Sequence, residues 1–352
     1  MKNFNKFIYY FLLLSFPLFQ ACENPEEQIP VGEYDHGVVI VNEGNFTKSD
    51  ASLSFYNPIT NEVQNDVFNK VNDRPVGSVL QSVHFVDGKG YLVVNNSNKI
   101  EVVNEADFSS IAVIEEGLAN PRYLVTSGGK AYISNWGTFD ADFKLDQSYI
   151  AVVDLSNLSV IKKINTENGT EKLAIAGNKL FALNSFTNTI SIIDLASETV
   201  EATLKLGNKP NGITLDNNGK VWVICGGSWE GNDGKLYAIN PSGNVIEKEI
   251  ELNMNTAGHL QTNKSQDKLY FTSGKSVYEL PVTATVAPGA PLFTNENLGS
   301  IYSLGIDPNS NIFYLGDAVA FKFNGKVYRH EANGTAIDDF SVGIGPNGFW
   351  FR

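Results

Sequence analysis

The chain has 352 residues, of which 42% are hydrophobic and only 18% are charged, and its formal net charge is −13 at pH 7. A charged fraction below the usual quarter is typical of many buried strands joined by polar loops. The acidity argues against nucleic acid or an anionic membrane surface as a binding partner.

Residues 1–21 have the pattern of a secretory signal peptide. Lys2 and Lys6 precede an apolar run over residues 7–19, which is too short to span a bilayer comfortably. Ala21 then stands directly before Cys22, an arrangement that resembles a bacterial lipobox. We therefore expect Cys22 to be the lipidated first residue of the mature protein, with plain secretion as the alternative.

Residues 22–36 are predicted to be a flexible tether. The stretch is acidic, contains proline and has no hydrophobic periodicity. An acidic segment behind an acylated cysteine resembles the surface-export signal of Bacteroidetes lipoproteins, and a generic solvated linker is the alternative. We expect a protein anchored by lipid to the outer membrane and exposed at the cell surface.

From residue 37 onward, one pattern of strands repeats seven times. Each copy has a short apolar strand, a polar break and a second alternating strand; the first strands end at residues 42, 95, 135, 184, 225, 273 and 316. Steps of 40 to 53 residues between such strand units predict a propeller. We expect an all-β fold over residues 37–352, a seven-bladed β-propeller with four-stranded blades.

Two further strands complete each predicted blade. An outer, edge-like strand follows the pair, as in residues 62–68, and charged side chains are expected to protect these outer strands from edge pairing. An inner strand precedes the pair in six units and is missing from the first. The C-terminal Pro346-Asn347-Gly348 mirrors Pro210-Asn211-Gly212. The last strand is therefore predicted to complete the first blade and close the ring.

The alternation of antiparallel strands predicts which loops share a face. The starts of the inner strands and the ends of the second strands lie at one edge of every blade, so their loops surround one mouth of the central channel. Amides and aromatics interleave there, which suits a large ligand of mixed polarity. The candidate ligand-binding residues are Asn42, Glu43, Asn45, Gln81, Arg122, Asn135, Trp136, Asn184, Asn211, Trp229, His259, Tyr302 and Asn347.

Each candidate also has a structural interpretation. Asparagine at a strand end often only caps backbone groups or adopts left-handed turns. Tryptophan in a blade usually packs between sheets, which fits Trp222 and Trp350; Trp136 and Trp229 border two enlarged loops and are better placed for contact.

Catalytic signals are weak. The four histidines lie on different units without metal-ligand spacing, and no nucleophile elbow, phosphate-binding loop or dinucleotide fingerprint is present. Cys225 ends an apolar run and is predicted to be a core residue. We expect a protein that is not an enzyme and needs no cofactor or metal, although a few acids on the predicted mouth would suit a cation.

The repeats resemble the YVTN-type β-propeller. More narrowly, VNEGNF (41–46), SLSFYNP (52–58), DVFNKVNDRPVG (66–77), VVNNSNKIEVV (93–103) and NPRYLV (120–125) resemble a family of Bacteroidetes surface propeller lipoproteins. That family includes BtuG-type proteins, which capture cobalamin and pass it to a TonB-dependent outer-membrane transporter. The resemblance implies a small-molecule ligand, with a corrinoid as one candidate, and such a transporter as partner of an otherwise monomeric protein.

Two other functions stay open. The protein can be a scaffold whose loop face contacts another protein of an uptake complex. Less in keeping with the sequence is a propeller hydrolase such as a lactonase, or a lyase acting on glycans, which needs a metal or an acid–base pair in the channel.

Overall fold

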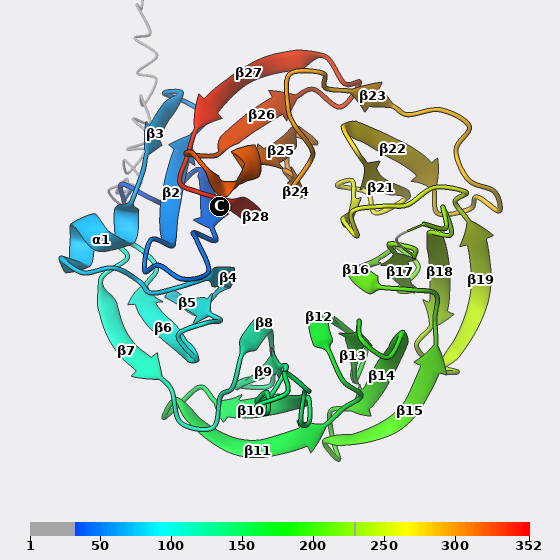
Figure 1. Ribbon diagram of the computed structural model, residues 1–352, viewed down its shortest axis with the longest axis horizontal. Coiled ribbons are helices and arrows are strands. Elements are labelled where there is room, and N and C mark those ends of the chain that lie inside the picture. The colour runs from blue at the N-terminus through cyan, green and yellow to red at the C-terminus, as the bar shows by residue number, and fades with distance from the viewer. Residues whose placement is uncertain (1–31, 229) are drawn as a thin grey trace, which may run out of the picture. The chain divides into compact units, whose positions relative to one another are not determined.

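The computed structural model, which describes residues 32–228 and 230–352, arranges its strands in seven sheets of four antiparallel strands around a common axis (Figure 1). The prediction of a seven-bladed β-propeller is confirmed. Gly32–Arg352 form one compact unit. Within the described ranges, neither helix has the length and apolar character needed to span a bilayer.

Six blades are made of four strands that follow one another in the chain, counted here from the axis outward. The second blade has β4 (Leu80–Val86), β5 (Lys89–Val94), β6 (Lys99–Asn104) and β7 (Ser110–Ile114). The third has β8 (Pro121–Ser127), β9 (Lys130–Asn135), β10 (Tyr149–Asp154) and β11 (Ser159–Asn165). The fourth has β12 (Thr170–Ala176), β13 (Lys179–Asn184), β14 (Thr189–Asp194) and β15 (Thr199–Lys205).

The remaining three sequential blades follow the same plan. The fifth has β16 (Pro210–Leu215), β17 (Val221–Cys225), β18 (Lys235–Asn240) and β19 (Val245–Glu251). The sixth has β20 (Leu260–Thr262), β21 (Lys268–Ser273), β22 (Ser276–Pro281) and β23 (Phe293–Thr294). The seventh has β24 (Ser303–Ile306), β25 (Phe313–Asp317), the short 3-10 helix η1 (Val319–Phe321), β26 (Lys326–His330) and β27 (Ala336–Ser341).

The first blade joins the two ends of the described chain. Its strands, from the axis outward, are β28 (Pro346–Phe351), β1 (Val38–Asn42), β2 (Ser52–Asn57) and β3 (Glu62–Gln64). β28 runs antiparallel to β1, with Val39 opposite Trp350, and in Figure 1 it lies beside the blue strands of the first blade. The ring closes as predicted, and this closure leaves β1 paired on both sides.

A helix interrupts the outer edge of the first blade, where a strand over residues 62–68 was predicted. β3 covers only the first three of these residues, and α1 (Val67–Asn72) follows. Val67 and Phe68 are each 1% exposed because they pack into the cluster between the first two blades. The prediction is wrong here because an edge strand would leave one of these neighbouring apolar side chains facing solvent.

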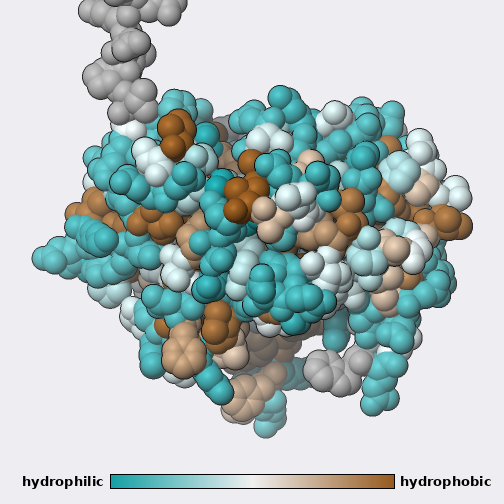
Figure 2. Space-filling view, turned by 90° about the horizontal axis from the view of Figure 1, so that it is seen from above, coloured by the Kyte–Doolittle hydropathy of each residue, from teal (hydrophilic) through white to brown (hydrophobic). Residues whose placement is uncertain are grey.

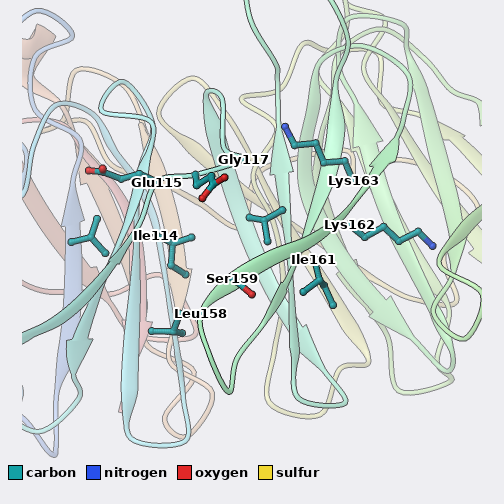
Figure 3. Close-up of a pocket in the computed structure, with 11 residues that line it drawn as sticks. Ile114, Glu115, Gly117, Leu158, Ser159, Ile161, Lys162 and Lys163 are labelled. Carbon is teal, nitrogen blue, oxygen red and sulfur yellow. The ribbon is translucent and has the colours of Figure 1, made fainter.

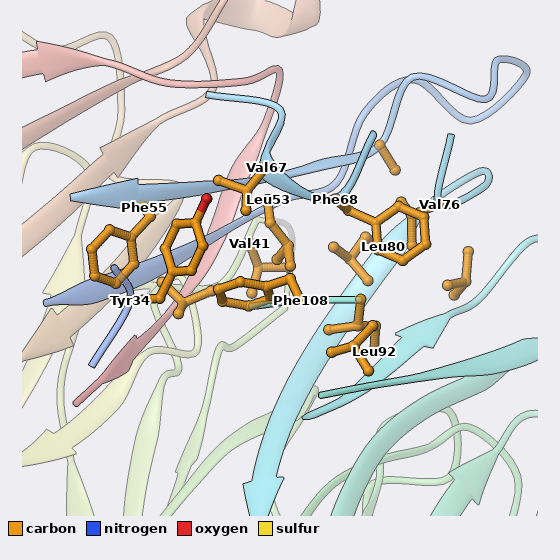
Figure 4. Close-up of a cluster of buried hydrophobic side chains, with 14 of the residues drawn as sticks. Tyr34, Val41, Leu53, Phe55, Val67, Phe68, Val76, Leu80, Leu92 and Phe108 are labelled. Carbon is orange, nitrogen blue, oxygen red and sulfur yellow. The ribbon is translucent and has the colours of Figure 1, made fainter. Parts of the chain in front are cut away.

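The core lies between neighbouring blades, since the middle strands are buried on both faces. Figure 4 shows the cluster between the first and second blades, which includes Leu53 and Leu92. Tyr34 belongs to it: its ring packs edge-on against Phe55 and Phe108, with centroids 5.1 and 4.9 Å away. Packing therefore begins before residue 37, inside the segment predicted to be a tether.

Two core predictions in the fifth blade are confirmed. Trp222 is fully buried, and its indole N–H donates to Oδ2 of Asp216 at 2.9 Å. Cys225 is also fully buried, and burial raises the pKa of its thiol to about 12. Both residues pack inside the protein, with no free polar group offered to the channel.

Charge does not protect the outer strand of the second blade. β7 has the sequence SIAVI, with no charged residue. It is instead shielded by a register shift against β6, and by the Asn72 side chain, which accepts a hydrogen bond from the N–H of Ser110 at 2.7 Å. Register shifts also occur along β11, β15, β19 and β27. Bulges are thus the common device at these edges.

Candidate functional site

One face of the ring collects the loops between blades and the loops between second and third strands; we call it the loop face. The strand register establishes it, since Asn135 pairs with Pro121, and Asn184 with Thr170. The ends of second strands therefore meet the starts of inner strands at one edge, as the sequence predicted.

The inner strands are joined around the axis by side chains that bond to the next blade. The Ser82 hydroxyl donates to the carbonyl of Arg122 at 2.8 Å, and the Ser303 hydroxyl donates to the carbonyl of Pro346 at 2.6 Å. These bonds fix the spacing of strands that pack only through side chains. Neighbouring inner strands are thereby linked around the channel.

A charged and aromatic group of residues, Glu43, Arg122, Trp136, Glu171 and Tyr302, lies where the inner strands begin; we call it the mouth cluster. Nε of Arg122 donates to Oε2 of Glu171 at 3.1 Å, and the guanidinium carbon lies 4.1 Å from the ring centroid of Trp136. The side chains of Arg122 and Glu171 are 15% and 12% exposed. A stacked, partly desolvated cation of this kind is stabilised by about 1–2 kcal/mol.

Glu43 and Tyr302 complete the mouth cluster from the first and seventh blades. The Tyr302 hydroxyl donates to Oε2 of Glu43, across 259 residues of sequence. Burial raises the pKa of the Glu43 carboxyl, although the Tyr302 hydrogen bond and the charge of Arg122 oppose this rise. Burial and the neighbouring Glu43 raise the pKa of Tyr302.

His259 lies in the channel wall with both ring nitrogens engaged. Nε2 is 2.9 Å from the carbonyl of Tyr302 and Nδ1 is 2.8 Å from the hydroxyl of Thr272. Because a carbonyl only accepts, Nε2 carries the proton and Nδ1 accepts from Thr272. Burial, with Lys172 nearby, lowers the pKa of His259 to about 3, so the imidazole is neutral at neutral pH.

Three strand-end asparagines are buried inside the blades. Asn42, Asn135 and Asn184 are each 0% exposed. Nδ2 of Asn42 donates to the Ser54 hydroxyl at 2.9 Å, and Oδ1 of Asn135 accepts from the N–H of Ala119 at 3.0 Å. Asn184 lies among the hydroxyls of Thr170, Thr189 and Ser191. Asn135 therefore satisfies a backbone group, whereas Asn42 and Asn184 bond to side-chain hydroxyls inside their blades.

The remaining predicted residues do not share one environment. Asn45 binds Asp50 through its backbone N–H and its Nδ2, at 2.7 and 2.8 Å, which shapes the loop after β1. Gln81, Asn211 and Asn347 each have a buried amide oxygen without a hydrogen-bond partner. Trp229 and Cys22 lie outside the described residues.

Exposed phenylalanines concentrate on the loop face. All of the phenylalanines that are strongly exposed in residues 32–228 and 230–352 lie in loops between second and third strands. We call them the aromatic rim: Phe46 (68% exposed), Phe139 (42%), Phe143 (88%), Phe186 (53%) and Phe323 (69%). The side view in Figure 2 shows hydrophobic side chains on loops that project from the ring.

Trp136 connects the aromatic rim with the mouth cluster. Its ring centroid lies 5.3 Å from that of Phe186 and 6.4 Å from that of Phe139. The guanidinium of Arg122 also lies over the Trp136 ring, with its carbon 4.1 Å from the ring centroid. Apolar contact area and a fixed charge are thus adjacent on one surface.

A separate groove of about 560 Å³ lies between the outer strands β7 and β11 (Figure 3). Glu115 and Glu116 line one side, and Lys162 and Lys163 line the other. It contains no residue of the mouth cluster or the aromatic rim. Its place on the circumference makes it a poor match for the convergent loops of the channel mouth.

Some residues of the site were missed by the sequence. Glu171, which holds Arg122, and Tyr123, which bonds to Gln81, were not singled out. Nothing in the sequence indicated that the phenylalanines of the aromatic rim are exposed, apart from their position in loops. Among the described residues, no three His, Cys, Asp or Glu side chains are grouped so that they could hold a metal ion.

Comparisons with known proteins agree with the fold. A family model described as "Domain of unknown function (DUF5074)" matches residues 36–342. No curated protein sequence matches the chain. A solved "quinonprotein alcohol dehydrogenase-like protein" from Bacteroides thetaiotaomicron is similar in structure, with a TM-score of 0.71, 16% identity, and coverage of 90% of this chain and 78% of that one.

A second solved structure, a protein of unknown function from Desulfotomaculum acetoxidans, has a TM-score of 0.67 and 12% identity, covering 90% of this chain and 98% of that one. A computationally designed protein, Ika8, has a TM-score of 0.60 and 12% identity, with 91% and 98% coverage. Likeness at such low identity concerns the propeller fold alone.

Proposed function

Since the chain belongs to the DUF5074 family, a domain of unknown function, we propose from its own geometry that it is a binding protein. It captures a small molecule on the loop face and passes it to a TonB-dependent outer-membrane transporter. The observation that carries this proposal is the aromatic rim, joined through Trp136 to the charged mouth cluster.

The aromatic rim supports binding because exposed aromatic area is unfavourable in water. Covering a largely exposed phenylalanine contributes about 1.5–3 kcal/mol, and Phe143 is 88% exposed. Soluble monomers rarely expose such side chains together unless the surface meets a ligand or partner. Because the aromatic rim lies on one face, covering the loop face would bury these exposed aromatic side chains together and so favour binding there.

The mouth cluster supports specificity. Arg122 is held by Glu171 on one side and stacks on Trp136, so little side-chain freedom remains for a ligand to remove. The partly buried Glu43 lies near enough to feel the charge of Arg122. A ligand with polar groups around an apolar body would find both kinds of contact.

We propose a corrinoid as the ligand. A broad, mainly apolar ring system with polar arms matches an aromatic rim around a polar mouth, and the resemblance of residues 41–46 and 120–125 points to the same class. In this proposal, Cys22 is lipidated and anchors the protein at the cell surface. The chain enters β1 at the edge opposite the loop face.

A second candidate function is contact with a protein alone, as a scaffold of an uptake complex. The high exposure of Phe143 and Phe323 favours it, because flat apolar area on projecting loops also suits a protein partner. Co-purification with an outer-membrane barrel in the absence of any corrinoid would support this role over ligand capture.

Isothermal titration of the mature protein with cobalamin and cobinamide tests the proposal. We expect saturable heat of binding. Trp136→Ala or Phe186→Ala should each weaken the affinity at least about tenfold, because each removes an aromatic contact that contributes about 1.4 kcal/mol or more to the binding free energy. Ile59→Ala is the matched control: Ile59 is 78% exposed, but lies in the β2–β3 turn on the opposite face. Absence of heat with every corrinoid would remove the ligand class, and equal weakening by the control would place the site elsewhere.

A further inference from the structure

A cavity of about 190 Å³ lies in the central channel, enclosed by the inner strands of several blades. Tyr123 of β8 and Lys172 of β12 both line it, and these two strands are neighbours at the centre of the ring (Figure 1). His259, Leu304 and Gly348 line it from other blades. Tyr123 and Lys172 are each the third residue of their strands, so the cavity begins close to the mouth cluster.

The amine of Lys172 has no hydrogen-bonded partner and no ion pair among the described residues. Its Nζ lies 5.9 Å from the ring centroid of Tyr123, and its positive charge acts on the imidazole of His259. Because both of these rings line the cavity, the amine lies beside the cavity as well. Lys172 is partly exposed, so the residue is neither tied to the protein through its amine nor sealed inside it.

The cavity offers no counter-ion to this amine, since none of the described residues that line it is acidic. Glu171, which precedes Lys172 in the chain, accepts a hydrogen bond from Nε of Arg122 at 3.1 Å. Burial lowers the pKa of the Lys172 amine, and the charge of Glu171 opposes this only in part. More of the amine is therefore neutral at pH 7 than in an exposed lysine, and only the neutral form is a nucleophile.

A second lysine, Lys248, shows what the cavity adds. Burial lowers the pKa of its amine too. Its Nζ, however, donates to the carbonyls of Val282 and Ala284, at 3.1 and 2.7 Å, and lies 5.4 Å from the ring centroid of Trp222. These contacts hold the nitrogen against the protein. Lys172 has no such bonds, and open volume lies beside it.

We propose that Lys172 is a nucleophilic amine that binds small neutral aldehydes reversibly as an imine, a role that does not depend on the proposed function. The lone pair of Nζ attacks the carbonyl carbon to form a C–N bond. Both amine protons pass to the carbonyl oxygen, water leaves, and a C=N bond remains, with no oxidant or reductant consumed. The apolar Val83, Leu304 and Phe349 line the same volume, which admits an aldehyde of a few carbon atoms, since one water takes about 30 Å³.

Reductive ethylation of the mature protein tests this proposal. Acetaldehyde is the probe, dimethylamine–borane reduces each imine as it forms, and peptide mass spectrometry follows the N-ethylation of every lysine. At pH 7, Lys172 should be ethylated at least about fivefold faster than the exposed Lys48, because more of its amine is neutral. The rate at Lys172 should also level off at a lower pH. Lys248 is the matched control and should react no faster than Lys48, because its nitrogen is bonded to two carbonyls.

Gly348→Val tests whether the aldehyde enters through the cavity. A Cβ at Gly348 meets only Val41, at 3.8 Å, so a side chain has room there and takes up part of the cavity. Ethylation of Lys172 should slow at least about threefold while that of Lys48 is unchanged. Ethylation of Lys172 no faster than of Lys48, or a rate unchanged in a Gly348→Val protein with the wild-type Tm, would overturn the proposal. The comparison of lysines within the wild type decides it even where the variant does not fold.

Discussion

Replacing Trp350 with alanine should weaken the closure of the ring. Trp350 lies in β28, opposite Val39 of β1, and its ring packs 5.5 Å from the centroid of Phe85 and 5.2 Å from that of His84. Truncation of a large aromatic in a core costs about 3–5 kcal/mol. Because Trp350 is only partly buried, we expect the lower end, about 3 kcal/mol.

The size of the effect on melting follows from the size of the domain. An unfolding entropy of about 2.1 cal/mol/K per residue gives about 0.7 kcal/mol/K for about 320 residues, so Tm should fall by about 4–5 °C. Differential scanning calorimetry of the mature protein measures this fall. Phe323→Ala is the control, since Phe323 is 69% exposed and its loss should change Tm by less than about 1 °C.

Deletion of residues 346–352 is the stronger form of the same experiment. It removes β28, and with it five paired positions along β1 and the wall of the channel. We expect loss of cooperative unfolding at room temperature. A Trp350→Ala protein that melts with the wild type, or a truncated protein that melts like the full chain, would refute the role of β28 in closure.

Three further predictions concern stability. His259 has a pKa of about 3 when folded and about 6.5 when unfolded, so its contribution is complete above pH 6.5 and is lost as pH falls toward 3. Urea unfolding between pH 6.5 and 4 should show an extra slope of up to about 1.4 kcal/mol per pH unit that His259→Gln lacks; identical slopes would contradict the assignment. Glu101 is fully buried between Arg74 and Lys99, at 2.6 and 2.8 Å, and Glu101→Gln should cost about 3 kcal/mol by leaving two cations without their carboxylate. The pKa of the Glu101 carboxyl is lowered although burial opposes this, so its contribution to the free energy of unfolding should be present above about pH 4.3 and lost below it. If the free energy of unfolding of the wild type and of Glu101→Gln changed equally with falling pH, the ion pairs of Glu101 would not have the proposed role. Tyr34→Ala should cost about 2–3 kcal/mol in the same assay, and no change would mean that residues before 37 add nothing to the domain.

The fold was predictable because the repeat carries its signal seven times. The spacing of the repeats and the alternation within each strand can still be recognised where a single copy is irregular. The closing strand was indicated by Pro346-Asn347-Gly348, which is similar to Pro210-Asn211-Gly212. The exception was the edge of the first blade, where α1 replaces the outer part of the strand. Burial of Val67 and Phe68 against another blade is a tertiary effect that local alternation does not record.

The site was predictable only in part. Glu171, which bonds to Arg122, was not singled out, because it is the second residue of β12 and neither its type nor its position distinguishes it from other acids in strands. The pairing of β12 with β13 shifts register between Thr170 and Leu173, and strand alternation in the sequence does not record such a shift. Residue type alone also could not distinguish the roles of Asn135 and Asn347. The amide oxygen of Asn135 accepts a hydrogen bond from the protein, whereas that of Asn347 has no partner, and only the folded structure shows this difference.

The double pairing of β1 has a mechanical consequence. The chain enters β1 at Val38, and this strand is bonded along one side to β28 and along the other to β2, with five paired positions on each side. Tension applied to the N-terminal side therefore acts along the strand and loads both rows of hydrogen bonds in shear. Such a row resists together, whereas a strand pulled from a free edge opens one pair at a time. The first blade is thus both the seam of the ring and the place where a pulling force would be borne.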